Sequence, residues 1–209
     1  DKKISCSIGI AGSDEVRNEE DINRLIKQAD DLLYQIKTTS KGRYIFMWEE
    51  GMRIQLPEKV SKIINCLTEA GYEAYAVGGC VRDTLLGRTP GDWDITTSAK
   101  PAEVKALFGR TIDTGILHGT VTVMLGKEGF EVTTYRIDGE YEDARHPKNV
   151  VYTANLLEDL KRRDFTINAM AYNDAEGLID VFDGIADLKK GVIRCVGDPM
   201  DRFGEDALR

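Results

Sequence analysis

The stretch GGCVRDTLLGRTPGDWDITT, residues 78–97, joins two adjacent glycines to a closely spaced pair of aspartates. EAYAVGG (73–79) predicts a short strand that runs into the glycines, and CVRDTLLG (80–87) predicts a short helix after them. Backbone N–H groups at such a junction can approach an anion, and Arg82, one helical turn in, can point back at it. A plain tight turn stays open as the alternative, since no GxxxxGK[ST] phosphate loop is present.

Asp92 and Asp94 belong to DWDITT (92–97), which predicts a strand. Residues i and i+2 of a strand project from the same face, so the two carboxylates should converge. Such a pair is unfavourable unless a cation neutralises it, and Mg²⁺ prefers oxygen ligands of this kind. Trp93 and Ile95 should face the core. A solvent-facing pair on an edge strand is the alternative.

A third carboxylate, Glu131, opens the strand EVTTY in the second half of a predicted hairpin. GTVTVML (119–125) and FEVTTYRI (130–137) form this hairpin around GKEG (126–129). If the strand of Glu131 neighbours the strand of Asp92 and Asp94, the three side chains form an acidic triad. Such a triad can hold two metal ions for phosphoryl transfer.

Two further charged motifs follow towards the end of the chain. RRDFTINAM places Arg162, Arg163 and Asp164 before an apolar stretch. The forked guanidinium group of an arginine in such a place suits the oxygens of a triphosphate. RFGEDALR places Asp206 and Arg209 on one helical face, where they form a surface ion pair or present polar groups to a nucleotide base. A solvated charge cluster is the alternative for the first motif.

Periodicity along residues 51–209 predicts an α/β domain with a mixed sheet. A final helix should begin near Asp198 and continue to Arg209, and DGEYEDARHPKNV (138–150) should be a mobile loop. The other predicted helices are LPEKVSKIINCLTEAG (56–71), KPAEVKALFG (100–109) and the first part of NLLEDLKRRDFTINAMAYN (155–173), whose end becomes a buried strand.

The bulk composition restricts the class of protein. The chain has 209 residues and a net charge of −8, which argues against a simple basic nucleic-acid coat. Its four cysteines, Cys6, Cys66, Cys80 and Cys195, form no CxxC pair and are expected to be reduced. No apolar run has the length of a membrane span and no signal-peptide pattern opens the chain, so a soluble cytoplasmic protein with no membrane or DNA partner is expected.

Residues 1–50 form a separate predicted unit with a β-α-β pattern. KISCSIGIAG (3–12) and RYIFMW (43–48) read as strands around a helix whose apolar residues recur at helical spacing. SIGIA and ADDLLYQIKTTSKGRYIF resemble the C-terminal end of the diguanylate cyclase (GGDEF) domain. The signature loop of that family is absent, so no cyclase activity is expected.

The motifs of residues 52–209 together resemble the head domain of bacterial CCA-adding tRNA nucleotidyltransferases, in the poly(A) polymerase family. The resemblance rests on VGGCVRDTLLGR, DWDITTSAKP, GTVTVM, EVTTYR, RRDFTINAMAY and VGDPMDRFGEDALR, in this order. It implies an enzyme that adds C, C and A to the 3′ end of tRNA from CTP and ATP with Mg²⁺. The neck, body and tail regions that hold tRNA in that family are absent from this chain. A poly(A) polymerase or a non-catalytic nucleotide-binding fragment are the alternatives.

The resemblance also implies roles for single residues. Asp92 and Asp94 would be Mg²⁺ ligands, with Glu131 as a supporting carboxylate. The nucleotide would be contacted at its phosphates, sugar and base edge by Gly79, Arg82, Arg163, Asp164, Asp206 and Arg209, of which the last two would act as a template for CTP and ATP.

Overall fold

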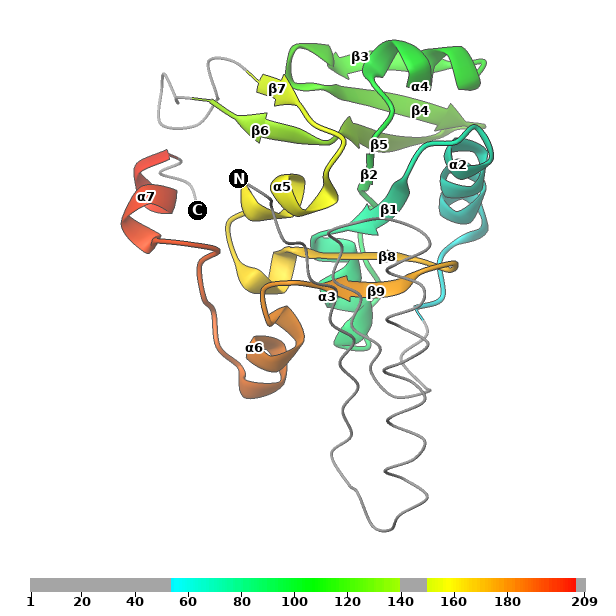
Figure 1. Cartoon of the computed structure of the whole chain (residues 1–209). Helices are drawn as coiled ribbons and strands as arrows, with labels where there is room; N and C mark the ends of the chain where they lie inside the picture. Colours follow the sequence, from blue (N-terminus) through cyan, green and yellow to red (C-terminus); the bar gives the residue numbers. More distant parts are fainter. Residues whose placement is uncertain (1–53, 140–149, 206–209) are drawn as a thin grey trace, which may run out of the picture.

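A computed structural model describes residues 54–139 and 150–205 of the chain (Figure 1). Within this part, the chain forms a seven-stranded sheet in the order β3-β4-β5-β2-β1-β8-β9 and a two-stranded sheet of β6 and β7. The pairing of β2 with β5 is parallel, and all other neighbours in both sheets are antiparallel. The predicted α/β class with a mixed sheet is confirmed.

Several sequence predictions fall outside the described residues. These are the β-α-β unit of residues 1–50 with its likeness to a GGDEF domain, most of the loop predicted at 138–150, and the predicted base-reading pair of Asp206 and Arg209.

The predicted helices and strands of residues 54–205 are confirmed with shifted ends. The helices are α2 (Glu58–Glu69), α3 (Gly79–Leu85), α4 (Pro101–Leu107), α5 (Leu156–Lys161), α6 (Gly184–Lys190) and α7 (Pro199–Glu205). The strands are β1 (Ala74–Val77), β2 (Ile95–Thr97), β3 (Thr111–Gly115), β4 (Thr120–Leu125), β5 (Glu128–Thr134), β6 (Arg136–Asp138), β7 (Val150–Tyr152), β8 (Met170–Asn173) and β9 (Gly177–Asp180). The sequence analysis did not anticipate β3, β7, β9 or α6. The single strand predicted at 130–137 is divided into β5 and β6, which belong to different sheets.

Strand β1 lies inside the sheet and is buried on both faces. Ala74 and Ala76 belong to the larger core cluster, which includes the apolar stripe of α2. Tyr75 and Val77 point the other way, into a second cluster that includes Leu160 of α5. This alternation is the period of two that a strand imposes, so one four-residue segment connects both halves of the core.

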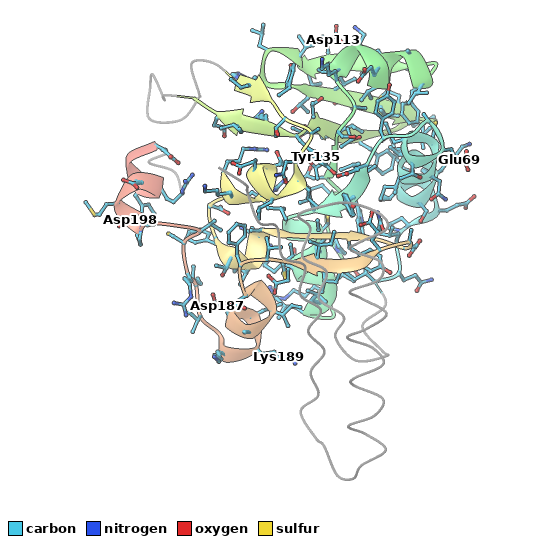
Figure 2. All side chains as sticks on the ribbon, in the orientation of Figure 1. Glu69, Asp113, Tyr135, Asp187, Lys189 and Asp198 are labelled. Carbon is cyan, nitrogen blue, oxygen red and sulfur yellow. The ribbon has the colours of Figure 1, made fainter. Side chains whose placement is uncertain are left out.

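Tyr135, between β5 and β6, is fully buried in the second cluster (Figure 2). Its backbone N–H donates to Thr97 O of β2 at 2.7 Å, and its backbone carbonyl accepts from Thr153 N at 3.0 Å. These bonds connect the large sheet to the β6–β7 hairpin, beside α5.

The strand predicted at 92–97 is shorter than expected. Regular pairing begins at Ile95, opposite Ala76 of β1, and only the carbonyl of Asp94 extends the ladder by accepting from Val77 N at 3.0 Å. Beyond Val77, the segment that follows β1 turns away from β2 at Gly78, which has a positive φ of 83°. Asp92 and Trp93 therefore have no β1 partner to pair with, and the aspartates precede the strand.

Glu131 was predicted to open its strand and instead lies within it. The β4–β5 hairpin pairs as far as Leu125 opposite Glu128, so β5 begins three residues earlier. The turn at GKEG is tighter than the sequence analysis assumed.

Cys66, Cys80 and Cys195 are free thiols, as expected. In the part of the chain that the structure describes, no helix combines the length and the apolar character needed to cross a membrane.

The contact between α6 and the segment before β8 gives a stability prediction. A Cβ at Gly184 would collide with the backbone carbonyl oxygen of Thr166 and approach its carbonyl carbon to 3.0 Å. We expect Gly184→Ala to lower the free energy of unfolding by about 1–3 kcal/mol, because buried backbone must move. Urea unfolding measures this. Gly109→Ala, where a Cβ meets nothing within 4 Å, is the control, and an equal effect of the two would contradict the packing described.

Candidate active site

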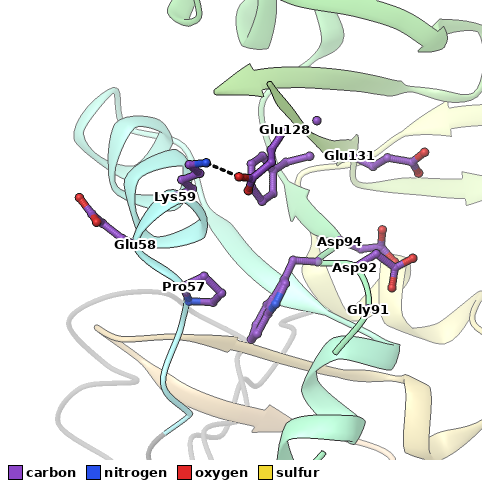
Figure 3. A pocket seen from close by; sticks show the side chains of 11 residues that line it. Pro57, Glu58, Lys59, Gly91, Asp92, Asp94, Glu128 and Glu131 are labelled. Carbon is purple, nitrogen blue, oxygen red and sulfur yellow. Dashed lines mark hydrogen bonds and ion pairs between the residues drawn. The ribbon is translucent and has the colours of Figure 1, made fainter. Parts of the chain in front are cut away.

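The carboxylates gather where β2 and β5 lie side by side. Ile95 of β2 pairs with Val132 of β5, so Asp94 and Glu131 precede paired residues on neighbouring parallel strands. Figure 3 shows the side chains of Asp92, Asp94 and Glu131 pointing to the same side. The adjacency of the two strands, on which the proposed triad depended, is present. Ile95 is buried and Trp93 packs against the core, also as expected.

The three acidic residues line an open pocket of about 760 Å³. Burial raises the pKa of the Asp94 carboxyl, the negative charges of Asp92 and Glu131 raise it further, and the positive charge of Arg163 partly offsets them. Asp94 therefore lies in a local field that favours a positive charge nearby. Although the surrounding protein partly desolvates the Asp94 carboxyl, Asp92 and Asp94 both keep solvent-exposed surface, so a bound cation could retain water.

The donor set fits Mg²⁺ through the aspartate pair rather than through a compact triad. Among residues 54–139 and 150–205, no group of three or more histidine, cysteine, aspartate or glutamate side chains is arranged to hold a metal ion. Mg²⁺ needs only one or two carboxylates, because water and substrate phosphates complete its shell. Asp92 and Asp94 could serve as these ligands, with Glu131 adding negative charge from β5.

Arg163 provides a buried positive charge next to the glycine turn. Its side chain is 17% exposed, and its Nη2 lies 3.4 Å from Oδ2 of the fully buried Asp159. A Cβ at Gly78 would lie 3.2 Å from Nη1, so the guanidinium approaches as closely as a glycine allows. Its Nε is buried without a hydrogen-bond partner among the described residues. A buried donor of this kind fits an anionic ligand.

Arg82 and Asp164 are connected through Asn168. Arg82 Nη1 donates to Asn168 Oδ1 at 2.7 Å, and Asn168 Nδ2 donates to Asp164 Oδ1 at 3.1 Å. A Cβ at Gly79 would lie 3.6 Å from Arg82 Nη2, which places this guanidinium beside the glycine turn as well. Arg82 and Arg163 thus both lie beside the glycine turn, and Arg82 is also paired with Asp83 at 2.9 Å.

The residues before β8 also contact α7. The rings of Phe165 and Phe203 lie edge to face with centroids 6.5 Å apart, and Arg202 Nη1 donates to Arg162 O at 3.4 Å. Helix α7 is the described part of the helix predicted to continue to Asp206 and Arg209. It therefore packs beside the segment of Arg163 and Asp164.

Sequence reasoning missed Asp159 and Asn168. Asp159 was given no role, although its spacing of three and four residues before Arg162 and Arg163 is a signal for ion pairs. Asn168 had no local signal, because its partner Arg82 is 86 residues away.

A mixed sheet with paired aspartates before one strand and a buried arginine beside a glycine turn defines a class, the nucleotidyltransferase-type α/β domain. The chain belongs to the poly(A) polymerase head-domain family, because the profile described as "Poly A polymerase head domain" matches residues 74–194, more than half of its length.

Several relatives are named as CCA-adding enzymes. The enzyme of Lactobacillus delbrueckii subsp. bulgaricus (strain ATCC BAA-365 / Lb-18) is 58% identical over 147 residues, which are 70% of this chain and 37% of that protein. The enzyme of Lactobacillus helveticus (strain DPC 4571) is 56% identical over 151 residues, 72% of this chain and 38% of that protein. The chain thus spans between a third and two fifths of the length of these relatives.

Solved structures give the same family. The Bacillus stearothermophilus CCA-adding enzyme in complex with CTP has a TM-score of 0.67 and 46% identity, covering 74% of this chain and 37% of that one. The Thermotoga maritima CCA-adding enzyme complexed with tRNA has a TM-score of 0.57 and 29% identity, covering 73% of this chain and 36% of that one.

The raised pKa of Asp94 predicts how stability depends on pH. The native state binds this proton more tightly than the unfolded state, so stability falls as pH rises from the ordinary aspartate pKa through the raised one. Without metal at pH 7, we expect Asp94→Asn to raise the free energy of unfolding by up to about 1 kcal/mol, limited by solvent screening.

Thermal unfolding in EDTA at pH 7 and pH 3 measures this effect. The gain should disappear at pH 3, where the carboxyl is protonated in both states. Added Mg²⁺ should stabilise the unsubstituted chain and leave the variant unchanged. Equal stabilisation of both by Mg²⁺ would exclude Asp94 as a ligand.

Gly78→Ala should weaken anion binding. The new Cβ lies 3.2 Å from Arg163 Nη1 and displaces the guanidinium, so we expect about a tenfold lower affinity for inorganic triphosphate, which is about 1.4 kcal/mol. Calorimetric titration measures it. Gly87→Ala is the matched control, since Gly87 has a positive φ of 70° but nothing within 4 Å of its Cβ. Equal affinities of the two variants would rule out the displacement.

Proposed function

We propose that this chain is the catalytic head of an enzyme that adds C, C and A to the 3′ end of tRNA, from CTP and ATP, with release of pyrophosphate. The observation that supports it most is the aspartate pair, Asp92 and Asp94, whose side chains point to the same side as Glu131 (Figure 3) and lie close enough to Arg163 for the charges of Asp94 and Arg163 to interact. The relatives named as CCA-adding enzymes support this choice of reaction within the family.

In the proposed reaction, the 3′-hydroxyl of tRNA attacks the α-phosphate of the nucleotide and pyrophosphate leaves. Mg²⁺ held by Asp92 and Asp94 would stabilise negative charge on the attacking and leaving oxygens. Arg163 and Arg82 bind the triphosphate oxygens beside the glycine turn at Gly79. Asp164, oriented by Asn168 Nδ2, lies near the ribose.

Base selection is proposed to depend on Asp206 and Arg209, which follow α7. Donors and acceptors aimed at a base edge discriminate strongly, since a wrong base leaves them unpaired. The Phe165–Phe203 contact supports this assignment, because it places α7 beside the segment that would bind phosphate and ribose. One short region would then recognise all parts of the nucleotide.

The reaction is proposed to take place in the cytoplasm. The proposal assigns no catalysis to residues 1–50, which we propose to be a GGDEF-like fragment without the catalytic loop of that family. The tRNA itself would be held mainly by regions that the family has beyond this head.

The reaction is tested in a chimera in which residues 54–209 replace the matching head of the Lactobacillus delbrueckii CCA-adding enzyme. We expect the chimera to incorporate labelled CTP and then ATP into tRNA that lacks CCA. Replacing both Asp92 and Asp94 by alanine should reduce incorporation by at least about a hundredfold, because the cation site is lost.

The control is Asp113→Ala on the outer strand β3. It removes an exposed ion pair with Lys105 of α4 and should leave incorporation unchanged. Undiminished incorporation by the double alanine variant would refute the metal assignment. Long ATP-only tails on generic RNA would instead identify a poly(A) polymerase, and CTP binding without any transfer would identify a nucleotide-binding head alone.

A further inference from the structure

A carboxylate outside the predicted site, Asp159 of α5, is fully buried where α5 meets both sheets. Its Oδ2 accepts from Thr96 Oγ1 of β2 at 3.0 Å and lies 3.4 Å from Arg163 Nη2. Its Oδ1 accepts from Arg162 Nε at 2.9 Å and from Arg136 N at 3.3 Å. One side chain thus connects β2, β6 and the two arginines that follow α5.

The charge of Asp159 is balanced mainly by the two arginines. Burial alone would raise the pKa of this carboxyl, but the positive charges of Arg162 and Arg163 outweigh it, so the pKa is lowered and Asp159 is ionised at neutral pH. In return, burial lowers the pKa of the Arg163 guanidinium and Asp159 offsets that effect. A buried guanidinium without this partner would be unfavourable.

Asp159 holds Arg163 at one edge only. Of the nitrogens of Arg163, Nη2 faces Asp159, Nη1 lies at the Gly78 backbone and Nε has no hydrogen-bond partner among the described residues. The contact therefore restrains the guanidinium at one end and leaves donor capacity for another ligand.

Thr96 extends the same constraint to the metal pair. It is the second residue after Asp94 and is fully buried in β2. Its hydroxyl contacts Oδ2 of Asp159, the oxygen nearest to Arg163. The position of the arginine is therefore tied by two contacts to the strand that begins directly after the aspartates.

We propose that Asp159 is a positioning residue for nucleotide binding, which holds the Arg163 guanidinium at the glycine turn and in register with Asp92 and Asp94. The inference rests on the proposed function in one respect, that Arg163 binds the triphosphate. A phosphate that contacts both the cation and Arg163 requires these groups to keep a fixed separation, and small misplacements weaken such sites strongly.

Asp187 of α6 provides a control that distinguishes a purely structural role of Asp159 from a role in positioning Arg163. Asp187 is also buried, accepts from Thr166 Oγ1 at 2.8 Å and pairs with Arg194 Nε at 3.0 Å. Neither partner is proposed to bind nucleotide, and Figure 2 shows Asp187 on α6. Asp187→Asn thus reproduces the loss of a buried, arginine-paired charge elsewhere in the domain.

The test is a double-mutant cycle on CTP affinity, measured by calorimetry with Mg²⁺ on the 209-residue chain. We expect Asp159→Asn to weaken CTP binding about tenfold, equal to about 1.4 kcal/mol. In an Arg163→Gln background the same change should weaken binding less than about twofold, because residues that act as a unit are not additive. Asp187→Asn should lower the melting temperature and leave CTP affinity unchanged.

Equal losses in both backgrounds, or CTP affinity unchanged by Asp159→Asn, would overturn the proposal while leaving the proposed function intact. Unchanged CTP affinity in Arg163→Gln would instead remove Arg163 from the proposed nucleotide site, and the positioning role with it. If Asp159→Asn does not fold, Thr96→Val replaces it. This variant removes one donor to Asp159 and should weaken CTP binding about threefold, again only when Arg163 is present.

Discussion

The parallel pairing of β2 with β5 is the constraint on which the rest of the site depends. The register of Ile95 opposite Val132 buries two core residues and sets Asp94 next to Glu131 across the strand boundary. On its other edge, β2 pairs with β1 only as far as Ala76, so the aspartates lie outside the regular ladder. Their side chains can then face solvent and a ligand while the strand behind them is buried.

Charge is arranged in layers around this strand. Asp92, Asp94 and Glu131 line the pocket, Arg163 lies beside the glycine turn, and the buried Asp159 lies behind the arginine. The alternation matters because Asp159 compensates the charge of Arg163, whereas negative charge is in excess around Asp94. A cation and a nucleotide phosphate together would complete the pattern.

The acidic net charge of the chain, −8, is consistent with this organisation. The carboxylates of the pocket contribute to it, and the positive charge beside the glycine turn comes from Arg82 and Arg163. A head of this kind is suited to hold a nucleotide through local contacts. Binding of a long polyanion such as tRNA needs further positive surface, which the relatives have room for in the larger part of their length.

The sequence alone determined the elements with a strong local pattern. These are the amphipathic α2 and the β4–β5 hairpin, which show periodic apolar residues, and the glycine turn after β1 and the aspartate pair, which are short motifs. It also predicted that Glu131 joins that pair if two strands are neighbours. Only the tertiary structure decided that they are, and that Asp159 meets Thr96 at a separation of 63 residues and Asn168 meets Arg82 at 86. Local periodicity follows from backbone geometry, whereas these partners depend on how distant segments share one core.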